Sequence, residues 1–217
     1  MITFDEPSHT YYDDGEKVKY NVTSLVDLFV KPFPAELIAG KVAKRDGTTT
    51  EAVLDMWGLK RDLATEYGNS VHKSVELFLK YGEYPKHECL REIVQKFQED
   101  FKGHEKFHSE VMVYDPELSV CGTIDMIEIE APKVISIWDT KTNGDLLEES
   151  KYKLTGPFKD LKATNINKYR IQLSIYKDLL ERRGNTVSRI GIWHPVEGLI
   201  ELEPLNIEPI WKEITSL

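Results

Sequence analysis

The sequence predicts a single domain of the α/β class. Helical periodicity covers most of residues 23–102, three short apolar strands follow in succession between 109 and 142, and a further helix then leads into a closing pair of strands. Such an order of helices and strands is typical of layered α/β architectures. The 217 residues are enough to bury one full core without crosslinks.

The charge is distributed unevenly along the chain. The formal net charge of −9 argues against indiscriminate coating of nucleic acid, but residues 141–189 carry eleven Lys/Arg against six Asp/Glu. Cys89 and Cys121 are the only cysteines and fit no metal-binding spacing, so we expect a reducing compartment and no disulfide, zinc or iron–sulfur site. No apolar run approaches the roughly 18 to 20 residues of a membrane span, so we expect a cytoplasmic protein without a membrane partner.

The first 62 residues predict a hairpin followed by helices. Residues 1–22 have the pattern of two short strands around a turn, and Thr23 or Ser24 can cap a helix that runs to Val30. Residues 35–62 have a helical pattern with a break near 47–50. The basic residues of these helices either contact phosphates or form an ordinary solvated face; they are Lys41, Lys44, Arg45, Lys60 and Arg61.

Two further helices are predicted, over 64–81 and 87–102. In the first, His72 and Glu76 are four residues apart and therefore share one face, beside the stripe that the helix buries. Taken alone, such a pair is more often an ordinary interaction of a helix surface than part of a metal site.

Strands are predicted over 109–114, 120–129 and 134–142, and the last two form a β-hairpin around a Pro-containing turn. Asp139 and Lys141 point the same way because side chains alternate along a strand. If Asp125 lies opposite, two carboxylates and one ammonium share a patch, and a divalent cation would offset the repulsion between the acids. A solvent-exposed salt bridge across the strands is the alternative.

A loop over 143–165 follows, and loops of this length are usually functional or mobile. Asn165 can cap the next helix, which runs to Arg183 and carries Gln172 one turn before Tyr176. Strands over 188–195 and 199–202 close the domain. Four aromatic residues near basic ones could stack on bases, although core packing explains such residues more often; they are Trp57, Tyr67, Tyr152 and Phe158.

Five elements occur in one order along residues 68–176. They are Gly68 followed by His72, Glu76 behind it, GTID at 122–125, WDTK at 138–141, and QLSIY at 172–176. Together they resemble the RecB-like branch of the PD-(D/E)XK nuclease superfamily, which also holds the lambda-type exonucleases. The resemblance covers half of the chain. The opening HTYYDDG, with VTSL shortly after it, also resembles the start of many phage-borne members.

The resemblance implies a restriction-endonuclease-like αβββαβ core, with a mixed central sheet flanked by helices. It implies one nuclease domain over 1–217, with a hairpin and helical elaboration over 1–63, the core over 64–205 and a C-terminal helix over 206–217. The residues that it assigns are Asp125 and Asp139 as metal-binding carboxylates, Lys141 as the catalytic lysine, His72 as a metal ligand, Glu110 as an accessory acid, and Gln172 with Tyr176 as a substrate-orienting pair. The family's second acid is often Glu; Asp139 is an allowed variant.

The ligand types favour Mg²⁺ or Mn²⁺ as the cofactor. Asp125 and Asp139 would hold the ion, and the backbone carbonyl of Thr140 is a reasonable third ligand. Imidazole is a softer ligand than oxygen, so direct binding by His72 would make Mn²⁺ at least as acceptable as Mg²⁺. Lys141 either takes a proton from water, with a lowered pKa, or stays charged and stabilises the phosphoryl group.

The expected function is that of a metal-dependent deoxyribonuclease, an exonuclease acting at DNA ends in recombination or repair. A structure-specific or single-strand endonuclease, and an inactive nucleic-acid-binding module, are the alternatives. The expected partner is DNA, as a duplex end or a single strand, with a recombination or single-strand-binding protein as a candidate second partner. The expected location is the cytoplasm, or the host cytoplasm for a phage-encoded chain.

Overall fold

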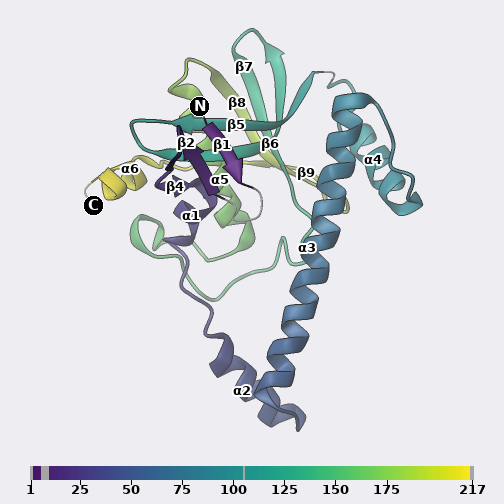
Figure 1. Cartoon of the computed structure of the whole chain (residues 1–217), viewed down its shortest axis with the longest axis vertical. Helices are drawn as coiled ribbons and strands as arrows, with labels where there is room; N and C mark the ends of the chain where they lie inside the picture. Colours follow the sequence, from purple (N-terminus) through teal and green to yellow (C-terminus); the bar gives the residue numbers. More distant parts are fainter. Residues whose placement is uncertain (1, 6–9, 105, 216–217) are drawn as a thin grey trace.

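The computed structural model describes residues 2–5, 10–104 and 106–215. Its centre is a six-stranded sheet (Figure 1). Five strands follow the order β4-β6-β7-β8-β9, and the sixth, β5, pairs with β6 along the edge opposite β7. The pairs β7–β8 and β4–β6 are parallel and the others are antiparallel. The strands are β4 (Tyr20–Asn21), β5 (Phe107–Asp115), β6 (Val120–Ala131), β7 (Val134–Thr140), β8 (Thr186–His194) and β9 (Gly198–Leu202).

Helices cover both faces of this sheet. The helices are α1 (Val22–Asp27), α2 (Ala35–Asp46), α3 (Thr50–Tyr81), α4 (Glu88–Asp100), α5 (Asn165–Glu181) and α6 (Glu208–Thr215). Apolar residues of α1, α5 and α6 form one core with the sheet, and those of α3 and α4 form a second core around Trp138 and Trp193. The expected mixed sheet flanked by helices is therefore confirmed. None of the helices in the described ranges is long and apolar enough to cross a membrane.

The β6–β7 hairpin agrees with the predicted one, although β7 ends at Thr140. Its turn contains Lys133 at φ 63°, a left-handed conformation that non-glycine residues adopt rarely. The two strands pair in register from Met126 opposite Trp138 to Ile129 opposite Ile135. This register decides which side chains of the two strands share a face.

The N-terminal hairpin is part of a small three-stranded sheet of β1 (Ile2–Asp5), β2 (Thr10–Asp13) and β3 (Glu16–Lys17). Residues 1 and 6–9 of the predicted hairpin lie outside the described residues. The predicted cap of α1 was wrong: Asn21 is the N-cap, and its side chain accepts a hydrogen bond from the Ser24 N–H at 2.6 Å. This capping box places the start of the helix earlier than expected.

Helix α3 is one continuous helix of 32 residues, so the predicted break between 62 and 64 was wrong. Thr49 caps it, and no proline interrupts the pattern before Gly82 ends it in a left-handed conformation. The division expected between 63 and 64 falls inside α3. The first half of α3 packs against α2 around Ala39, Ala43 and Val53, and the two helices project away from the sheet as an arm (Figure 1).

Helix α5 begins one residue earlier than expected, because Thr164 rather than Asn165 is the N-cap and accepts from the Asn167 N–H at 3.2 Å. The loop before it contains a short 3₁₀ turn, η1 (Gly156–Phe158). The predicted C-terminal helix is α6, and residues 216–217 of that prediction lie outside the described residues.

Candidate metal site and cleft

The β6–β7 register places Asp125 next to Asp139. Backbone pairing of the two strands stops at Met126 opposite Trp138, and the next pair in the same register is Asp125 and Asp139. Opposite residues of antiparallel strands point to the same face. At this point the N–H of Thr140 donates a hydrogen bond to Asp125 Oδ2 at 2.8 Å. The C=O and N–H of one strand residue point to the same side, so the Thr140 carbonyl also faces β6, as the predicted ligand role requires.

Glu110 lies opposite Asp125 on the other edge of β6. Its neighbours pair as Ser109 with Met126 and Val111 with Ile124, so Glu110 occupies the position across from Asp125. Its backbone has φ 53°, which is rare for a residue with a side chain and costs on the order of 1–3 kcal/mol. A strained residue at this position indicates that the carboxyl group is held where the regular strand would not place it.

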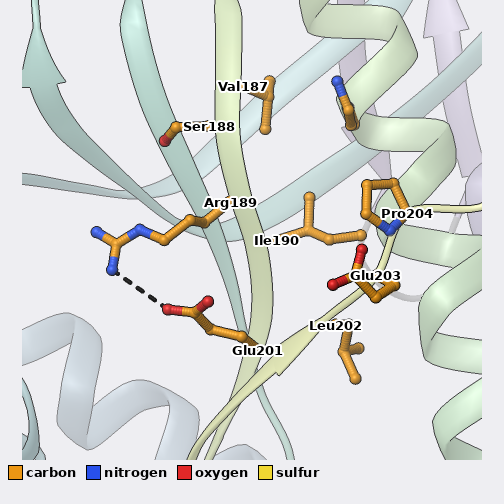
Figure 2. Close-up of a pocket in the computed structure, with 9 residues that line it drawn as sticks. Val187, Ser188, Arg189, Ile190, Glu201, Leu202, Glu203 and Pro204 are labelled. Atoms are coloured by element: carbon orange, nitrogen blue, oxygen red, sulfur yellow. Dashed lines mark hydrogen bonds and ion pairs between the residues drawn. The ribbon is translucent and has the colours of Figure 1, made fainter.

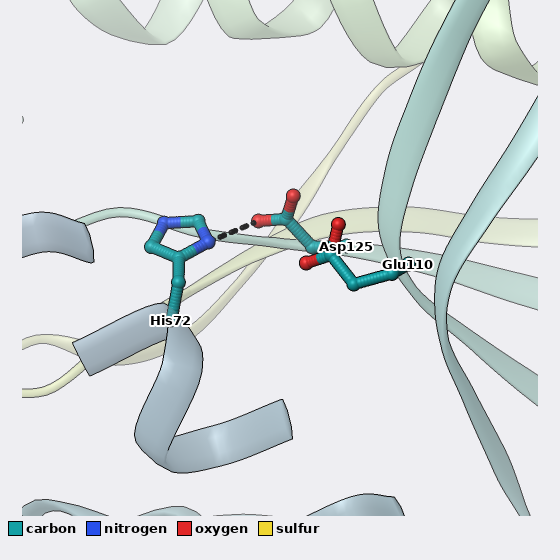
Figure 3. Close-up of side chains that lie close together, drawn as sticks. All are labelled: His72, Glu110 and Asp125. Carbon is teal, nitrogen blue, oxygen red and sulfur yellow. Dashed lines mark ion pairs between the residues drawn. The ribbon is translucent and has the colours of Figure 1, made fainter. Parts of the chain in front are cut away.

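Helix α3 brings His72 to the same place. A Cβ at Gly68 would lie 3.2 Å from Thr142 Oγ1, so a small residue lets the helix approach the end of β7. His72 Nδ1 then lies 3.2 Å from Asp125 Oδ2 (Figure 3). One ligand atom from each of His72, Glu110 and Asp125 lies within 4.8 Å of the other two. We call these three residues the His-Glu-Asp cluster.

The carboxyl group of Glu110 is affected by its surroundings. Partial burial and the nearby charges of Asp125 and Glu76 raise its pKa to about 7. The residue is nevertheless exposed, so water screens part of this effect. The carboxylate of Glu76 lies 2.5 Å from Lys80 Nζ, in an ion pair along α3, and Glu76 also lines the hollow beside Glu110.

Asp139 and Lys141 form a buried ion pair beside the cluster. The Asp139 side chain is only 4% exposed, and its Oδ2 faces Lys141 Nζ. That oxygen is buried and receives no well-aligned hydrogen bond. Burial raises the pKa of Asp139 to about 6; the charge of Lys141 opposes this shift and that of Asp125 adds to it.

Lys141 keeps its charge in the protein without a metal. Burial alone would lower its pKa, but the charges of Asp139 and Asp125 outweigh burial and raise the pKa above the usual value. Its ammonium also lies 4.8 Å from the ring centroid of Tyr169, which is a cation–π contact. Of the two roles predicted for Lys141, these surroundings favour the charged one.

Gln172 and Tyr176 lie on α5 and contact the same strand. Tyr176 is buried, and its hydroxyl donates to the Thr123 carbonyl at 2.8 Å. A Cβ at Gly122 would lie 2.7 Å from that hydroxyl, which explains the glycine of the GTID motif. Gln172 lies close to the Tyr176 hydroxyl and lines the same hollow as Asp125. This geometry makes Tyr176 a residue that positions β6.

Two hollows meet at the His-Glu-Asp cluster. The larger, of about 710 Å³, contains Asp125, Asp139, Lys141 and Gln172, and the smaller, of about 500 Å³, contains His72. Both are lined by Glu110 and Asp125. The predicted site residues therefore line two hollows that share Glu110 and Asp125: His72 lines the smaller, and Asp139, Lys141, Gln172 and Tyr176 line the larger.

Tyr169, on α5, is a residue near Lys141 that the sequence analysis did not single out. It lies three residues before Gln172 and seven before Tyr176, and this spacing along one helix face is the signal that could have placed its ring near Lys141. Of the aromatic residues considered for stacking, Phe158 is buried against Phe29 and belongs to the core. Trp57 is half-buried and packs on the exposed Phe33, and Tyr67 and Tyr152 are exposed.

The basic side chains of residues 141–189 are less available for contacts with nucleic acid than the composition of this segment suggests. Arg189 lies 2.8 Å from Glu130 and 3.5 Å from Glu201, at a small hollow of about 140 Å³ between β8, β9 and the loop after β9 (Figure 2). Lys162, in the loop before α5, pairs with Glu149. These pairs neutralise part of the positive charge within the segment itself.

No protein-family model matches the chain, and no curated protein sequence matches it. Among solved structures, the chain is similar to a protein of Eubacterium rectale described as "Putative exonuclease", with a TM-score of 0.35 and 15% sequence identity over 90% of this chain and 67% of the other. A likeness of this size shows neither a family nor an activity, so the functional argument depends on the site itself.

Proposed function

We propose that this chain is a divalent-metal-dependent deoxyribonuclease that hydrolyses phosphodiester bonds at DNA ends, as an exonuclease of recombination or repair. The observation that carries the proposal is the His-Glu-Asp cluster beside the Asp139–Lys141 ion pair, at two hollows that share Glu110 and Asp125. Three acids and one imidazole come from three strands and a helix far apart in the sequence. A surface salt bridge requires no such convergence and no strained backbone at Glu110.

The donor set fits a divalent cation. Glu110 and Asp125 supply oxygen atoms and His72 supplies a nitrogen, within the 4.8 Å separation that a shared ion requires. The buried Asp139 Oδ2, which lacks an aligned hydrogen bond, and the Thr140 carbonyl are the further candidate ligands. When bound, the ion would supply Lewis-acid polarisation of the phosphodiester and a more acidic water. The imidazole makes Mn²⁺ at least as suitable as Mg²⁺.

The chain's own residues then have separate roles. Lys141, held in its charged form by Asp139 and Asp125, stabilises the negative charge that develops on the phosphoryl oxygens. Tyr176 fixes β6 through Thr123, and Gln172 orients the substrate from the side of the cleft. Asp139 is buried and the Lys141 side chain is 20% exposed, so the limited contact of this pair with water strengthens the effect of its charges on the substrate.

The test uses end-labelled linear DNA and closed circular DNA with Mg²⁺, Mn²⁺ or EDTA. Metal-dependent loss of linear DNA with intact circles supports the exonuclease. Nicking of circles identifies the alternative, a structure-specific or single-strand endonuclease. Absence of cleavage of DNA and RNA with every metal, together with binding of DNA, would leave the inactive binding module and refute the nuclease.

A further inference from the structure

The position of the Lys141 ammonium depends on few contacts. Its side chain is 20% exposed and has four rotatable bonds, so it can adopt several arrangements unless contacts along it select one. The ammonium faces Asp139 Oδ2, but that carboxylate is also a candidate ligand of the ion. An ion at Asp139 would share the negative charge that now attracts Lys141. A second partner, which the ion does not share, would keep the ammonium in place.

The ring of Tyr169 is such a partner. Its centroid lies 4.8 Å from Lys141 Nζ, and the face of an aromatic ring attracts a cation because it carries partial negative charge. The ring packs against the core that α5 forms with the sheet. Tyr169 lines neither of the two hollows. It therefore contacts the ammonium without occupying the space that is open to a substrate.

Asn143 fixes the ring through its hydroxyl group. Tyr169 Oη donates to Asn143 Oδ1 at 3.1 Å, and Asn143 Nδ2 donates to Asp145 Oδ1 at 2.8 Å. The backbone carbonyl of Asn143 accepts from the N–H of Leu146 at 3.2 Å, and Leu146 is buried. These contacts define the orientation of the Asn143 amide. The Tyr169 ring is therefore held both at its hydroxyl and by its packing in the core.

The segment that follows β7 is joined both to β8 and to the start of α5. The Lys141 N–H donates to the Trp193 carbonyl at 3.0 Å, which continues the pairing of β7 with β8. Asn165 Nδ2 donates to the Asp145 carbonyl at 3.3 Å, at the first turn of α5. The segment therefore has a fixed position relative to α5, which carries Tyr169, and the ring and the ammonium meet in one defined geometry.

Building on the proposed nuclease function, we infer that Tyr169 and Asn143 are positioning residues for Lys141. The face of the ring holds the ammonium where it can reach the phosphoryl group, and Asn143 holds the ring. The alternative is a ring that only fills space in the core. The two differ in one property, because attraction of an ammonium depends on the electron density of the ring face, whereas packing depends on the size of the ring.

The stability experiment changes the electron density of the ring and leaves its size nearly constant. Tyr169→Phe is compared with three forms of this variant in which the phenylalanine ring carries one, two or three fluorine atoms, since fluorine withdraws electrons from the ring face. In urea denaturation with EDTA at pH 7, the midpoint should fall stepwise, by about 0.2–0.5 M over the series. The same series in Lys141→Met should show no stepwise fall. Equal changes of the midpoint in both backgrounds overturn the inference.

Tyr152 provides the matched control, because its ring centroid lies 5.4 Å from Lys151 Nζ in the loop before α5. The two residues are neighbours in the sequence and the ring is 63% exposed, so their contact is available in the unfolded chain as well. The same fluorinated series at Tyr152 should leave the urea midpoint and kcat unchanged. A stepwise fall of equal size at Tyr152 would show that fluorination acts without a folded contact and would overturn the inference.

The kinetic experiment measures kcat and KM on end-labelled linear DNA with Mn²⁺. Across the fluorinated series at Tyr169, kcat should fall about 2- to 30-fold while KM stays within about twofold, because Tyr169 lines neither hollow. Tyr169→Phe and Asn143→Ala remove the same hydrogen bond, so each should lower kcat about 2- to 12-fold, and the double variant should lose no more than either.

Failure of the positioning role and failure of the proposed function give different results. Cleavage by wild type with a constant kcat across the fluorinated series overturns the positioning role and leaves the nuclease standing. A rise of KM at constant kcat assigns Tyr169 to substrate binding and also overturns the role. Absence of cleavage by wild type refutes the nuclease, and the dependence of the urea midpoint on Lys141 then decides whether the ring holds the ammonium.

Discussion

Replacing Lys141 with Met should make the stability of the metal-free protein depend strongly on pH above pH 6. The substitution keeps most of the side-chain volume but removes the positive charge that faces Asp139, a side chain only 4% exposed. Asp139 then loses the ammonium group that lowers its pKa, and its carboxyl group should remain protonated in the folded protein at a higher pH than in wild type.

The size of the effect follows from the pKa of Asp139. Its folded-state pKa of about 6 lies above the usual 3.8. Ionisation of Asp139 therefore lowers the stability of wild type as the pH rises from 3.8 to about 6, and above pH 6 this loss stays constant. In Lys141→Met the cost keeps growing by about 1.4 kcal/mol for each further pH unit. At pH 8 the variant should be about 3 kcal/mol less stable than wild type, and near pH 5 the two should be similar, because Asp139 is protonated in both.

Urea denaturation in EDTA at pH 5, 6, 7 and 8 measures this difference. Lys162→Met is the matched control, because its partner Glu149 and its own side chain are both exposed, so we expect less than about 1 kcal/mol at every pH. Adding Asp139→Asn to Lys141→Met should remove the pH dependence. A parallel offset between variant and wild type at all four pH values would refute the assignment of Asp139 as the responsible group.

Three further predictions concern neighbouring residues. Asp125→Asn should abolish turnover and weaken Mn²⁺ binding in calorimetry, while its side chain still accepts the hydrogen bond from the Thr140 N–H. Asp125→Ala loses that acceptor as well, so its free energy of unfolding in urea should fall by about 1 kcal/mol. Full activity of either variant would contradict the site. Gly122→Ala should lower stability by about 1–3 kcal/mol, because its methyl group would lie 2.7 Å from the Tyr176 hydroxyl. An unchanged melting temperature would show that α5 can shift to make room for the methyl group. Glu110→Gln should stabilise the metal-free protein at pH 8 and not at pH 4, because the raised pKa of Glu110 means that its charged form costs stability only above about pH 4.5. The residue is exposed, so the gain in the free energy of unfolding is about 1 kcal/mol after screening by water. A gain at both pH values would point to packing instead.

The β6–β7 hairpin and its two acids were predictable because the strand repeat has a period of two. Once the turn near Pro132 is located, the register places Asp125 beside Asp139, and the alternation places Lys141 on the same side. The mixed sheet flanked by helices was implied by the resemblance of the motifs between Gly68 and Tyr176 to a nuclease family, and not by periodicity. These features depend on local patterns that one sequence displays.

Other parts of the site depend on long-range contacts that a single sequence does not display. The left-handed backbone of Glu110 could not be predicted from the residue pattern of β5. In the structure Glu110, expected only as an accessory acid, lies beside His72 and Asp125. Strand β2 docks through Tyr11 on Cys121 and Thr123, more than a hundred residues later. The true cap at Asn21 was missed because Thr23 and Ser24 have equally good capping side chains nearby.

The unbroken course of α3 gives the site a mechanical property. From Thr50 to His72 the helix is about 33 Å long, and no proline divides it, so the arm and His72 belong to one stiff rod. Val71 and Val75, buried in the core around Trp138, fix one end of that rod to the sheet. A tilt of the helix about this fixed end would move the far end of the arm much further than it moves His72.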